Sequence, residues 1–309
     1  MKRRFSLGVS VLLAACGGGG STSVDAGPDA VEARCDPAKP FGPPVLATEL
    51  NTTGDDGCAR LYNNELDLVF CRRAVGGNFD VWTAHRDSRD AAFDAPSLVT
   101  SANSVSNDVW PAVSPEGLVL VNDADRTTPG AYRMWASKRA STDQPFSAPA
   151  LITELLPSDI HGYFANAHSI YFDSPTRPGQ GSNDIWHVDY SDLGTLGTPT
   201  PVIGDVNTSE EEVIPVLTAD ETSIYFRRST TTPNADPMMP PTVETDVWTA
   251  SRTTPTDGFG TSSKIAGLDL VNETETPTWV SDDNCVLWGQ INDTGRPTLL
   301  DIWRAERPR

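Results

Sequence analysis

The chain has 309 residues, with 42 acidic and 23 basic side chains and a formal net charge of −19. This acid excess argues against nucleic acid as a partner, because phosphate binding needs a clustered positive field, and against an anionic membrane surface as the main partner. Hydrophobic residues make up 38% of the sequence, enough for a packed interior, whereas 25 prolines and 24 glycines argue against long amphipathic helices.

The first residues have the organisation of an export signal. A positively charged start precedes an apolar stretch over residues 5–13, which is too short to span a bilayer as a helix. The tetrapeptide Leu13–Cys16 (Leu-Ala-Ala-Cys) resembles the lipobox of bacterial lipoproteins. That resemblance implies a signal peptide over 1–15, an acylated Cys16 that anchors the protein to a membrane, and, with Gly17 after it, an outer-membrane destination. An ordinary secretory peptide is the alternative.

Residues 16–40 are expected to form a tether. They contain a Gly/Ser run followed by a Pro-, Ala- and Asp-rich stretch, a composition that cannot bury a core. The predicted folded domain covers residues 41–309. The tether is expected to hold that domain away from the lipid.

Five repeats fill the predicted domain. Each repeat opens with a large apolar residue followed by a small one, and closes with a strand that contains Trp. The opening residues are Phe41, Phe93, Phe146, Leu196 and Phe259, and the closing ones are Trp82, Trp135, Trp186, Trp248 and Trp303. Four short strands per repeat, without a helix-period segment, predict an all-β fold, a five-bladed β-propeller of four-stranded antiparallel blades.

A turn motif makes the resemblance more specific. In the second repeat, Pro111–Gly117 reads Pro-x-x-Ser-Pro-Glu-Gly, and an apolar strand follows. With the Asp-Ile-Trp strands and the basic residue soon after, this resembles the TolB-type, WD-repeat-like propeller family over residues 41–309. The first and third repeats lack the turn motif. Family blades begin at the inner strand, so the resemblance implies that residues 41–50 supply the outermost strand of the last blade, beside Asp301–Ala305, and close the ring.

Four cysteines remain beside Cys16, and they allow three pairings. Cys58 and Cys71 lie about equally far from a predicted turn and should face each other across an antiparallel pair. If the ring closes as expected, Cys35 and Cys285 meet on one face and join the two ends of the domain. An exported protein permits both disulfides, and four free thiols are the alternative.

The sequence contains no recognisable catalytic or metal-binding motif. It has four His without paired helical spacing, no Cys-x-x-Cys, no Gly-x-Ser-x-Gly and no phosphate-binding Gly loop. We therefore assign no catalytic residue, no metal ligand and no cofactor, with Ca²⁺ as a weak alternative. The Asp that precedes Trp in four repeats is interpreted as structural, because a residue that recurs in every blade usually serves the fold.

The candidate binding face is acidic. Carboxylates gather in the loops before the inner strands, which share one face around the channel mouth of a propeller: Asp55, Asp56, Asp108, Asp159, Glu210, Glu211, Glu212, Glu273 and Glu275. Such a rim would attract Ca²⁺, a basic partner or a cationic ligand, and solvated loop charge is the alternative. An insertion over 229–245, with Met238 and Met239, is expected on the same face as an adaptable contact or a tolerated loop expansion.

These features favour a membrane-anchored envelope lipoprotein, monomeric and non-catalytic, whose propeller is a scaffold for an envelope protein or a ligand. The alternative is a five-bladed glycosidase with carboxylates at the channel mouth. Asp55, Asp108 and Glu211 would be its nominal candidates. Against this alternative, exposed loops make a raised carboxyl pKa hard to arrange.

Overall fold

The computed structural model describes residues 33–74, 76–192, 195–234, 239, 241–268, 274–292 and 300–309. The compact unit begins at Arg34, earlier than the expected boundary at residue 41. The expected signal peptide over 1–15 and the acylated Cys16 lie outside the described residues. In the part of the chain that is described, no helix has the length and apolar character needed to cross a membrane.

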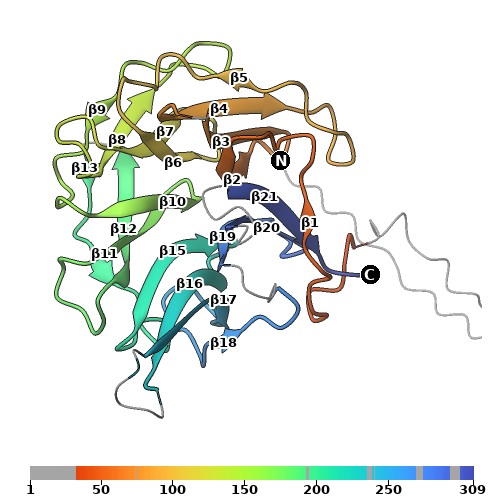
Figure 1. The fold of residues 1–309 in the computed structure, drawn as a ribbon, viewed down its shortest axis with the longest axis vertical. Helices are drawn as coiled ribbons and strands as arrows, with labels where there is room; N and C mark the ends of the chain where they lie inside the picture. Colours follow the sequence, from red (N-terminus) through yellow and green to blue (C-terminus); the bar gives the residue numbers. More distant parts are fainter. Residues whose placement is uncertain are drawn as a thin grey trace, which may run out of the picture. The chain divides into compact units, whose positions relative to one another are not determined.

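The described chain forms five antiparallel sheets, which are the predicted five blades of a propeller (Figure 1). From inner to outer strand, blade 1 contains β2 (Asp55–Tyr62), β3 (Asp67–Arg73), β4 (Phe79–His85) and β5 (Ser97–Leu98). Blade 2 contains β6 (Asp108–Val113), β7 (Val119–Ala124), β8 (Arg133–Lys138) and β9 (Ala150–Leu151). Blade 3 contains β10 (Ile160–Asn166), β11 (Ser169–Ser174) and β12 (Asp184–Asp192), with β13 (Thr195–Leu196) and β14 (Thr200–Pro201) both pairing with β12.

The last two blades complete the ring. Blade 4 contains β15 (Glu211–Leu217), β16 (Ser223–Thr232), β17 (Thr242–Ser251) and β18 (Ser263–Lys264). Blade 5 contains β19 (Thr274–Val280), β20 (Val286–Asn292), β21 (Leu300–Glu306) and, from the other end of the chain, β1 (Val45–Leu46). The all-β prediction with five repeats is confirmed.

Ring closure occurs where the sequence predicted it. Val45 lies opposite Arg304, and Leu46 lies opposite Trp303, so β1 is the outermost strand of blade 5 (Figure 1). The backbone N–H of Gly42 also donates to the carbonyl of Glu306 at 2.8 Å. A closed ring leaves no blade without neighbours, which protects the sheet edges.

Two disulfides are present, with the expected pairing. Cys35 and Cys285 are bonded with their Cα atoms 5.6 Å apart and join the segment before β1 to the turn before β20. Cys58 and Cys71 are bonded with their Cα atoms 5.5 Å apart, and they join β2 to β3. All four side chains are buried.

The core lies between the blades. Phe70, Phe172 and Phe226 occupy the same position on the second strands of blades 1, 3 and 4, and each is fully buried. Each Phe lies opposite the repeat Trp of the neighbouring third strand. An arginine stacks on that Trp in blades 1 to 4, with its guanidinium 4.5–5.4 Å from the ring centre. The repeat Trp residues therefore pack the blades rather than form an open platform.

Each inner strand carries a β-bulge. In blades 1 to 4 the bulged residue has a positive φ, between 51° and 60°; these residues are Cys58, Trp110, His161 and Ile214. A bulge frees a backbone N–H from the ladder. The freed N–H groups of Cys58, His161 and Ile214 donate to Gln290, Asp123 and Asp173 of the preceding blade. The bulges thus bring polar side chains to the channel wall.

Candidate functional site

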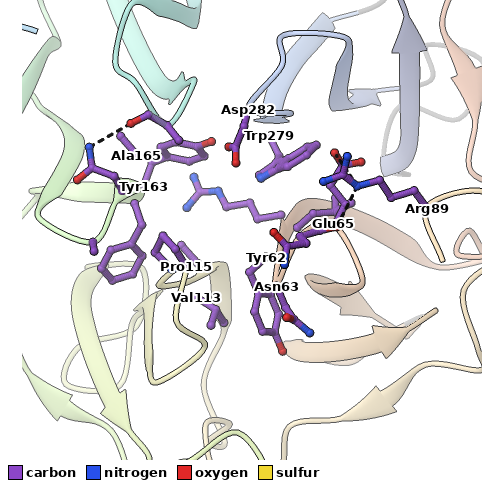
Figure 2. Close-up of a pocket in the computed structure, with 18 residues that line it drawn as sticks. Tyr62, Asn63, Glu65, Arg89, Val113, Pro115, Tyr163, Ala165, Trp279 and Asp282 are labelled. Carbon is purple, nitrogen blue, oxygen red and sulfur yellow. Dashed lines mark hydrogen bonds and ion pairs between the residues drawn. The ribbon is translucent and has the colours of Figure 1, made fainter. Parts of the chain in front are cut away.

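The channel between the blades has a cavity at each end. The loop-side cavity, of about 260 Å³, lies at the end where the inner strands begin. Its walls include the Cys58–Cys71 disulfide and the side chains of Phe79, Trp110, Asp123, Tyr132, His161 and Leu300. The turn-side cavity, also of about 260 Å³, lies at the other end and is lined by the first turn of every blade (Figure 2).

Arg60 crosses the channel between blades. It belongs to β2 of blade 1, and its Nη1 donates to the carbonyl oxygen of Gly162 in blade 3. Its guanidinium lies 5.7 Å from the ring centre of Trp110 and 5.4 Å from that of Tyr163. The side chain is 2% exposed, and burial lowers the pKa of Arg60 to about 10. Its Nε and Nη2 have no hydrogen-bond partner among the described residues.

Two buried carboxyl groups flank His161. Asp123 accepts a hydrogen bond from the backbone N–H of His161 at 2.7 Å. Asp173 lies 2.7 Å from Nδ1 of the same His, and it also accepts the N–H of Ile214. Oδ1 of Asp123 and Oδ2 of Asp173 have no partner in the described part of the chain. Burial raises the pKa of Asp123 to about 6, although the nearby His161 and Arg60 lower it.

The described channel wall thus brings together the guanidinium of Arg60, the carboxyl groups of Asp123 and Asp173 and the imidazole of His161, and Arg60 and both carboxyl groups have atoms without a partner among the described residues. Buried polar groups without partners are costly, so such a cluster favours a ligand or water that supplies both kinds of hydrogen bond. The raised pKa of Asp123 also allows proton exchange near neutral pH. The sequence prediction missed all four residues, although Arg60 stands between apolar neighbours, Ala59 and Leu61, in the second half of its inner strand, which was the available signal.

The expectation that the loop acids form an exposed rim is wrong. Four of them have side chains with 0% exposure, and each forms an ion pair with an arginine of its own blade at 2.5–2.7 Å. The pairs are Asp56–Arg72, Asp108–Arg126, Asp159–Arg177 and Glu212–Arg228. The physical reason is the arginine, which compensates the charge and lets the carboxylate be buried beneath the loop. None of these acids lines either channel cavity.

The remaining acids of the predicted face that the structure describes form hydrogen bonds or are buried. Asp55 pairs with Arg73 at 2.6 Å and accepts the N–H of Leu300. Glu211 accepts hydrogen bonds from Ser229 and Asn183, and Glu210 accepts one from the backbone of Thr231. Glu275 is 1% exposed. Glu273 and Met238 lie outside the described residues, and Met239 is 56% exposed.

The 229–245 insertion extends a hairpin. Strands β16 and β17 continue to pair as far as Thr232 opposite Thr242, beyond the length of the other blades. Residues 235–238 and 240, near its tip, lie outside the described residues. Because β16 runs from the turn side towards the loop side, the hairpin extends on the loop side, the face that the sequence analysis predicted.

A second motif explains why the loop acids are buried. Asn103 makes two hydrogen bonds to the backbone of Val81 on the third strand of the preceding blade. The next residue, Ser104, donates from its backbone and its hydroxyl to Asp108. The same pattern, Asn-Ser/Thr-x-x-x-Asp/Glu, occurs at Asn51–Asp56 and Asn207–Glu212. This repeated spacing is visible in the sequence and marks the acids as structural.

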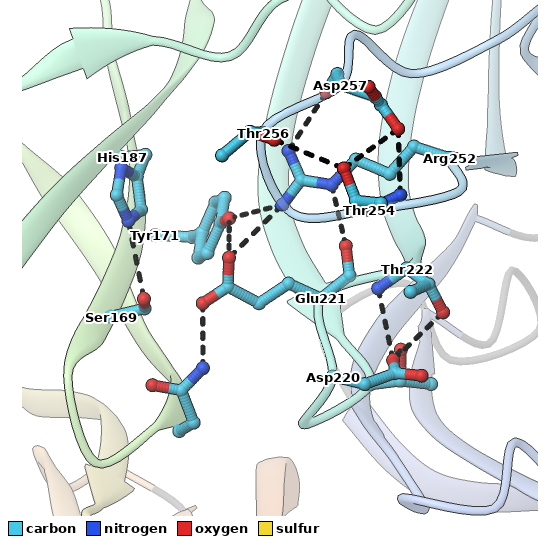
Figure 3. Close-up of polar contacts among 12 residues, drawn as sticks. Ser169, Tyr171, His187, Asp220, Glu221, Thr222, Arg252, Thr254, Thr256 and Asp257 are labelled. Atoms are coloured by element: carbon cyan, nitrogen blue, oxygen red, sulfur yellow. Dashed lines mark hydrogen bonds and ion pairs between the residues drawn. The ribbon is translucent and has the colours of Figure 1, made fainter.

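A polar cluster joins blades 3 and 4 outside the channel (Figure 3). Glu221 accepts hydrogen bonds from the Tyr171 hydroxyl at 2.8 Å and from Asn166 at 2.7 Å. Arg252 lies 3.1 Å from the same carboxylate and 3.0 Å from the Tyr171 hydroxyl. Burial, and then the Glu221 charge, raise the pKa of Tyr171. The cluster satisfies its own members and links the two blades.

The cluster does not contain a catalytic triad. His187 lies 3.4 Å from Ser169 Oγ and 3.4 Å from Asp189 Oδ1, but both contacts involve Nε2. A triad needs the nucleophile and the carboxylate on opposite ring nitrogens. Burial also lowers the pKa of His187. This arrangement is therefore not that of a serine hydrolase.

Solved structures share the fold at low sequence identity. A GH43_1 enzyme from Xanthomonas citri is 12% identical, with 87% of this chain and 91% of that chain covered and a TM-score of 0.55. The RS223 β-xylosidase is 10% identical, with 85% and 94% covered and a TM-score of 0.52. TolB from Acinetobacter baumannii is 11% identical, with a TM-score of 0.48; 84% of this chain is covered, but it spans only 56% of that TolB chain.

At these identities the likeness shows the fold alone. No protein-family profile matches the chain, and no curated protein matches its sequence. Function is therefore argued from the channel and its residues.

Proposed function

We propose that the protein is a non-catalytic binding module of the bacterial cell envelope, and that its loop-side cavity receives a cationic group from an envelope protein or a small ligand. One observation carries the proposal: a buried oxygen of Asp123 has no partner among the described residues, and Asp123 lines a cavity with aromatic walls. Trp110, Tyr132 and Phe79 offer apolar area and attract cations. A Lys, Arg or amine group would supply the missing donor for Asp123.

The charge of the protein supports a cationic partner. The formal net charge is −19, and a field of that sign raises the local concentration of basic groups. The loop acids are neutralised by arginines within their own blades. Selectivity would therefore come from the channel carboxyls, while the general field would speed association.

We also propose that lipid at Cys16 anchors the protein to the outer membrane, as the lipobox resemblance implies. The compact unit begins at Arg34, so residues 17–33 would separate it from the lipid. Replacement of Cys16 by Ser should move the protein from the membrane fraction to the soluble fraction of the envelope. Retention in the membrane fraction would contradict the anchor.

Site-specific crosslinking tests the binding proposal. A photo-reactive amino acid at Tyr132, inside the cavity, should capture one dominant envelope protein or ligand from intact cells. The same probe at Leu98, on the exposed outer edge of blade 1, is the matched control. The product from Tyr132 should be lost in Asp123→Asn. Identical products from both positions, or a product that Asp123→Asn leaves unchanged, would contradict the proposal.

Glycoside hydrolysis is the second candidate, and one observation favours it. Asp123 and Asp173 are two buried carboxyls in the channel, and the raised pKa of Asp123 is what a general acid needs. Asp55 and Asp108, which the sequence suggested for this role, pair with arginines instead. The test is the release of 4-nitrophenol from aryl β-xyloside and α-arabinofuranoside between pH 5 and 7. Turnover that disappears in Asp123→Asn and Asp173→Asn would support catalysis, and turnover that survives both would exclude this pair.

A further inference from the structure

The turn-side cavity contains an unused arginine edge. Arg60 lines this cavity, is 2% exposed, and has no hydrogen-bond partner for Nε or Nη2 among the described residues. Its Nη1 is already bonded to the carbonyl of Gly162. The guanidinium also lies 5.7 Å from the ring centre of Trp110 and 5.4 Å from that of Tyr163. The arginines that bind the loop acids, Arg72, Arg126, Arg177 and Arg228, each form an ion pair with a carboxylate. Arg60 differs from these four because no described carboxylate forms an ion pair with it.

The free edge has a defined shape. Nε and Nη2 lie on the same side of a guanidinium, and their two N–H groups point in parallel at a spacing that fits the two oxygens of a carboxylate. Leaving a buried charge without a counter-charge is costly, so an anion at this edge would recover both hydrogen bonds and charge compensation. Asp123 and Asp173 act on Arg60 through space, and neither forms an ion pair with it in the described part of the chain.

We propose that the turn-side cavity binds a small ligand that carries a carboxylate, with its two oxygens bonded to Nε and Nη2 of Arg60. Tyr62, Tyr163 and Trp279 line the same cavity and offer ring surface to the apolar part of the ligand (Figure 2). The two nitrogens are closed off from solvent, so binding includes a small shift of the Arg60 side chain. A cavity of about 260 Å³ suits a small organic acid.

The other charges in the cavity restrict the ligand. Glu65 is already held by Arg34 at 2.9 Å, and Arg89 is bonded to the carbonyl of Asn64. Asp282 faces the cavity from the blade 5 turn (Figure 2), and burial raises its pKa. Its negative charge disfavours a second charge on the ligand. A monocarboxylate should therefore bind better than a phosphate, which carries more charge.

This inference is independent of the proposed function. The carboxylate site lies at the turn-side end of the channel and uses the N–H donors of Arg60. The proposed function uses the carboxylate acceptor of Asp123 at the loop-side end. Failure to find a partner for the loop-side cavity would not contradict the carboxylate site at Arg60. Failure to find carboxylate binding would likewise not contradict the proposed loop-side partner.

Titration calorimetry with defined probes tests the inference on the mature protein. Phenylacetate provides a carboxylate with one ring, and phenylacetamide is its neutral isostere. Wild-type protein should bind phenylacetate about tenfold or more tightly than phenylacetamide, because the amide has one acceptor and no charge. Arg60→Met should remove this preference. Arg89→Met, at the rim, should change the affinity less than about threefold, because Arg89 is partly exposed and already bonded.

A lysine variant tests the inference even if Arg60→Met fails to fold. A second anion tests whether charge alone is enough for binding. Arg60→Lys keeps the charge but loses the paired edge, so it should bind phenylacetate several-fold more weakly than wild type even if Arg60→Met fails to fold. Inorganic phosphate should bind more weakly than phenylacetate. Equal binding of phenylacetate and phenylacetamide by wild type, unchanged affinity in Arg60→Lys, or tighter binding of phosphate would overturn the assignment.

Discussion

At the scale of single residues, the buried carboxylates of the channel differ from those of the loops in whether both oxygens have hydrogen-bond partners. Asp108 accepts hydrogen bonds from Ser104, Asn122 and Arg126, so its buried carboxylate is fully compensated. Asp123 is equally buried but has one oxygen without a partner among the described residues. Uncompensated burial costs stability, and it concentrates at sites that bind or react.

The pKa of Asp123 leads to a prediction about stability and pH. Burial raises its folded pKa from 3.8 to about 6, so between these values the native state holds a proton that the unfolded state has lost. The free energy of unfolding should therefore fall as pH rises from 4 to 6, by about 3 kcal/mol from this residue. Asp123→Asn cannot ionise and should remove that decline, which urea unfolding at several pH values measures.

The control for this titration is an exposed carboxyl. Asp94 lies on the surface before the outer strand of blade 1, and Asp94→Asn should leave the pH dependence of wild type unchanged. A decline that is equally steep in wild type and Asp123→Asn would show that another group is responsible.

At the scale of elements, two arginine contacts recur in the blades. At the loop end, an arginine pairs with the acid of the inner strand and stacks on the repeat Trp. At the turn end, an arginine four residues after the Trp donates Nε to a turn carbonyl and stacks on the Phe that opens the repeat. The second set is Arg86–Phe93, Arg139–Phe146, Arg252–Phe259 and Arg307–Phe41.

The turn-end contact explains two landmarks of the sequence. The basic residue after Trp contacts the Phe that opens the following repeat, seven residues later in blades 1, 2 and 4, and in blade 5 it contacts Phe41 from the other end of the domain. Blade 3 replaces the pair with Tyr190 and Leu196, and Tyr190 packs on Phe164 instead, with ring centres 5.4 Å apart. Blade 3 therefore has Leu196 where the other repeats open with Phe.

Neighbouring arginines of blade 4 provide a matched test of the loop-end contact. Arg228 and its partner Glu212 are buried, whereas Arg227 is 27% exposed and lies 3.8 Å from Glu211. Arg228→Ala would leave Glu212 buried without compensation, so the free energy of unfolding should fall by about 3–5 kcal/mol. Arg227→Ala should cost about 0–1 kcal/mol. Chemical denaturation measures both, and equal losses would contradict a structural role specific to Arg228.

At the scale of the whole molecule, the two ends of the compact unit hold the ring closed. Strand β1 pairs with β21, and Cys35 is bonded to Cys285. Arg34 adds ion pairs to Glu65 of blade 1 and Asp283 of blade 5, at 2.9 and 2.8 Å. The segment before β1 thus contacts both the first and the last blade, which is why the compact unit begins at Arg34.

The two disulfides should differ in their contribution to stability. Cys35 and Cys285 are 250 positions apart, whereas Cys58 and Cys71 are 13 apart. In the chain-entropy model, the longer loop constrains the unfolded state more, by about 5 against about 3 kcal/mol. The double variant Cys35→Ser/Cys285→Ser should therefore melt at a lower temperature than Cys58→Ser/Cys71→Ser. The opposite order, measured by calorimetry on both double variants, would contradict the prediction that the longer loop contributes more to stability.

The prediction of the fold succeeded where the information is local and repeated. Turn residues, alternating strands and the Phe and Trp landmarks recur in the repeats, so blade count, strand order, closure and the cysteine pairing could be inferred. The prediction of the acidic face failed because burial depends on partners. Asp108 and Asp159 each lie 18 residues before the arginine that compensates them, and the sequence analysis did not connect the two.

The sequence was enough to infer the five blades and, through the phase of the repeat in the family that it resembles, the closure by residues 41–50, because short repeated patterns carry this information. Only the tertiary structure decided which charged residues serve the fold and which face the channel. Arg60 bonds to Gly162, 102 positions away, and shares the channel with Asp123 and Asp173 of two other blades. A channel is lined by one strand from every blade, so its chemistry exists only once the ring has closed.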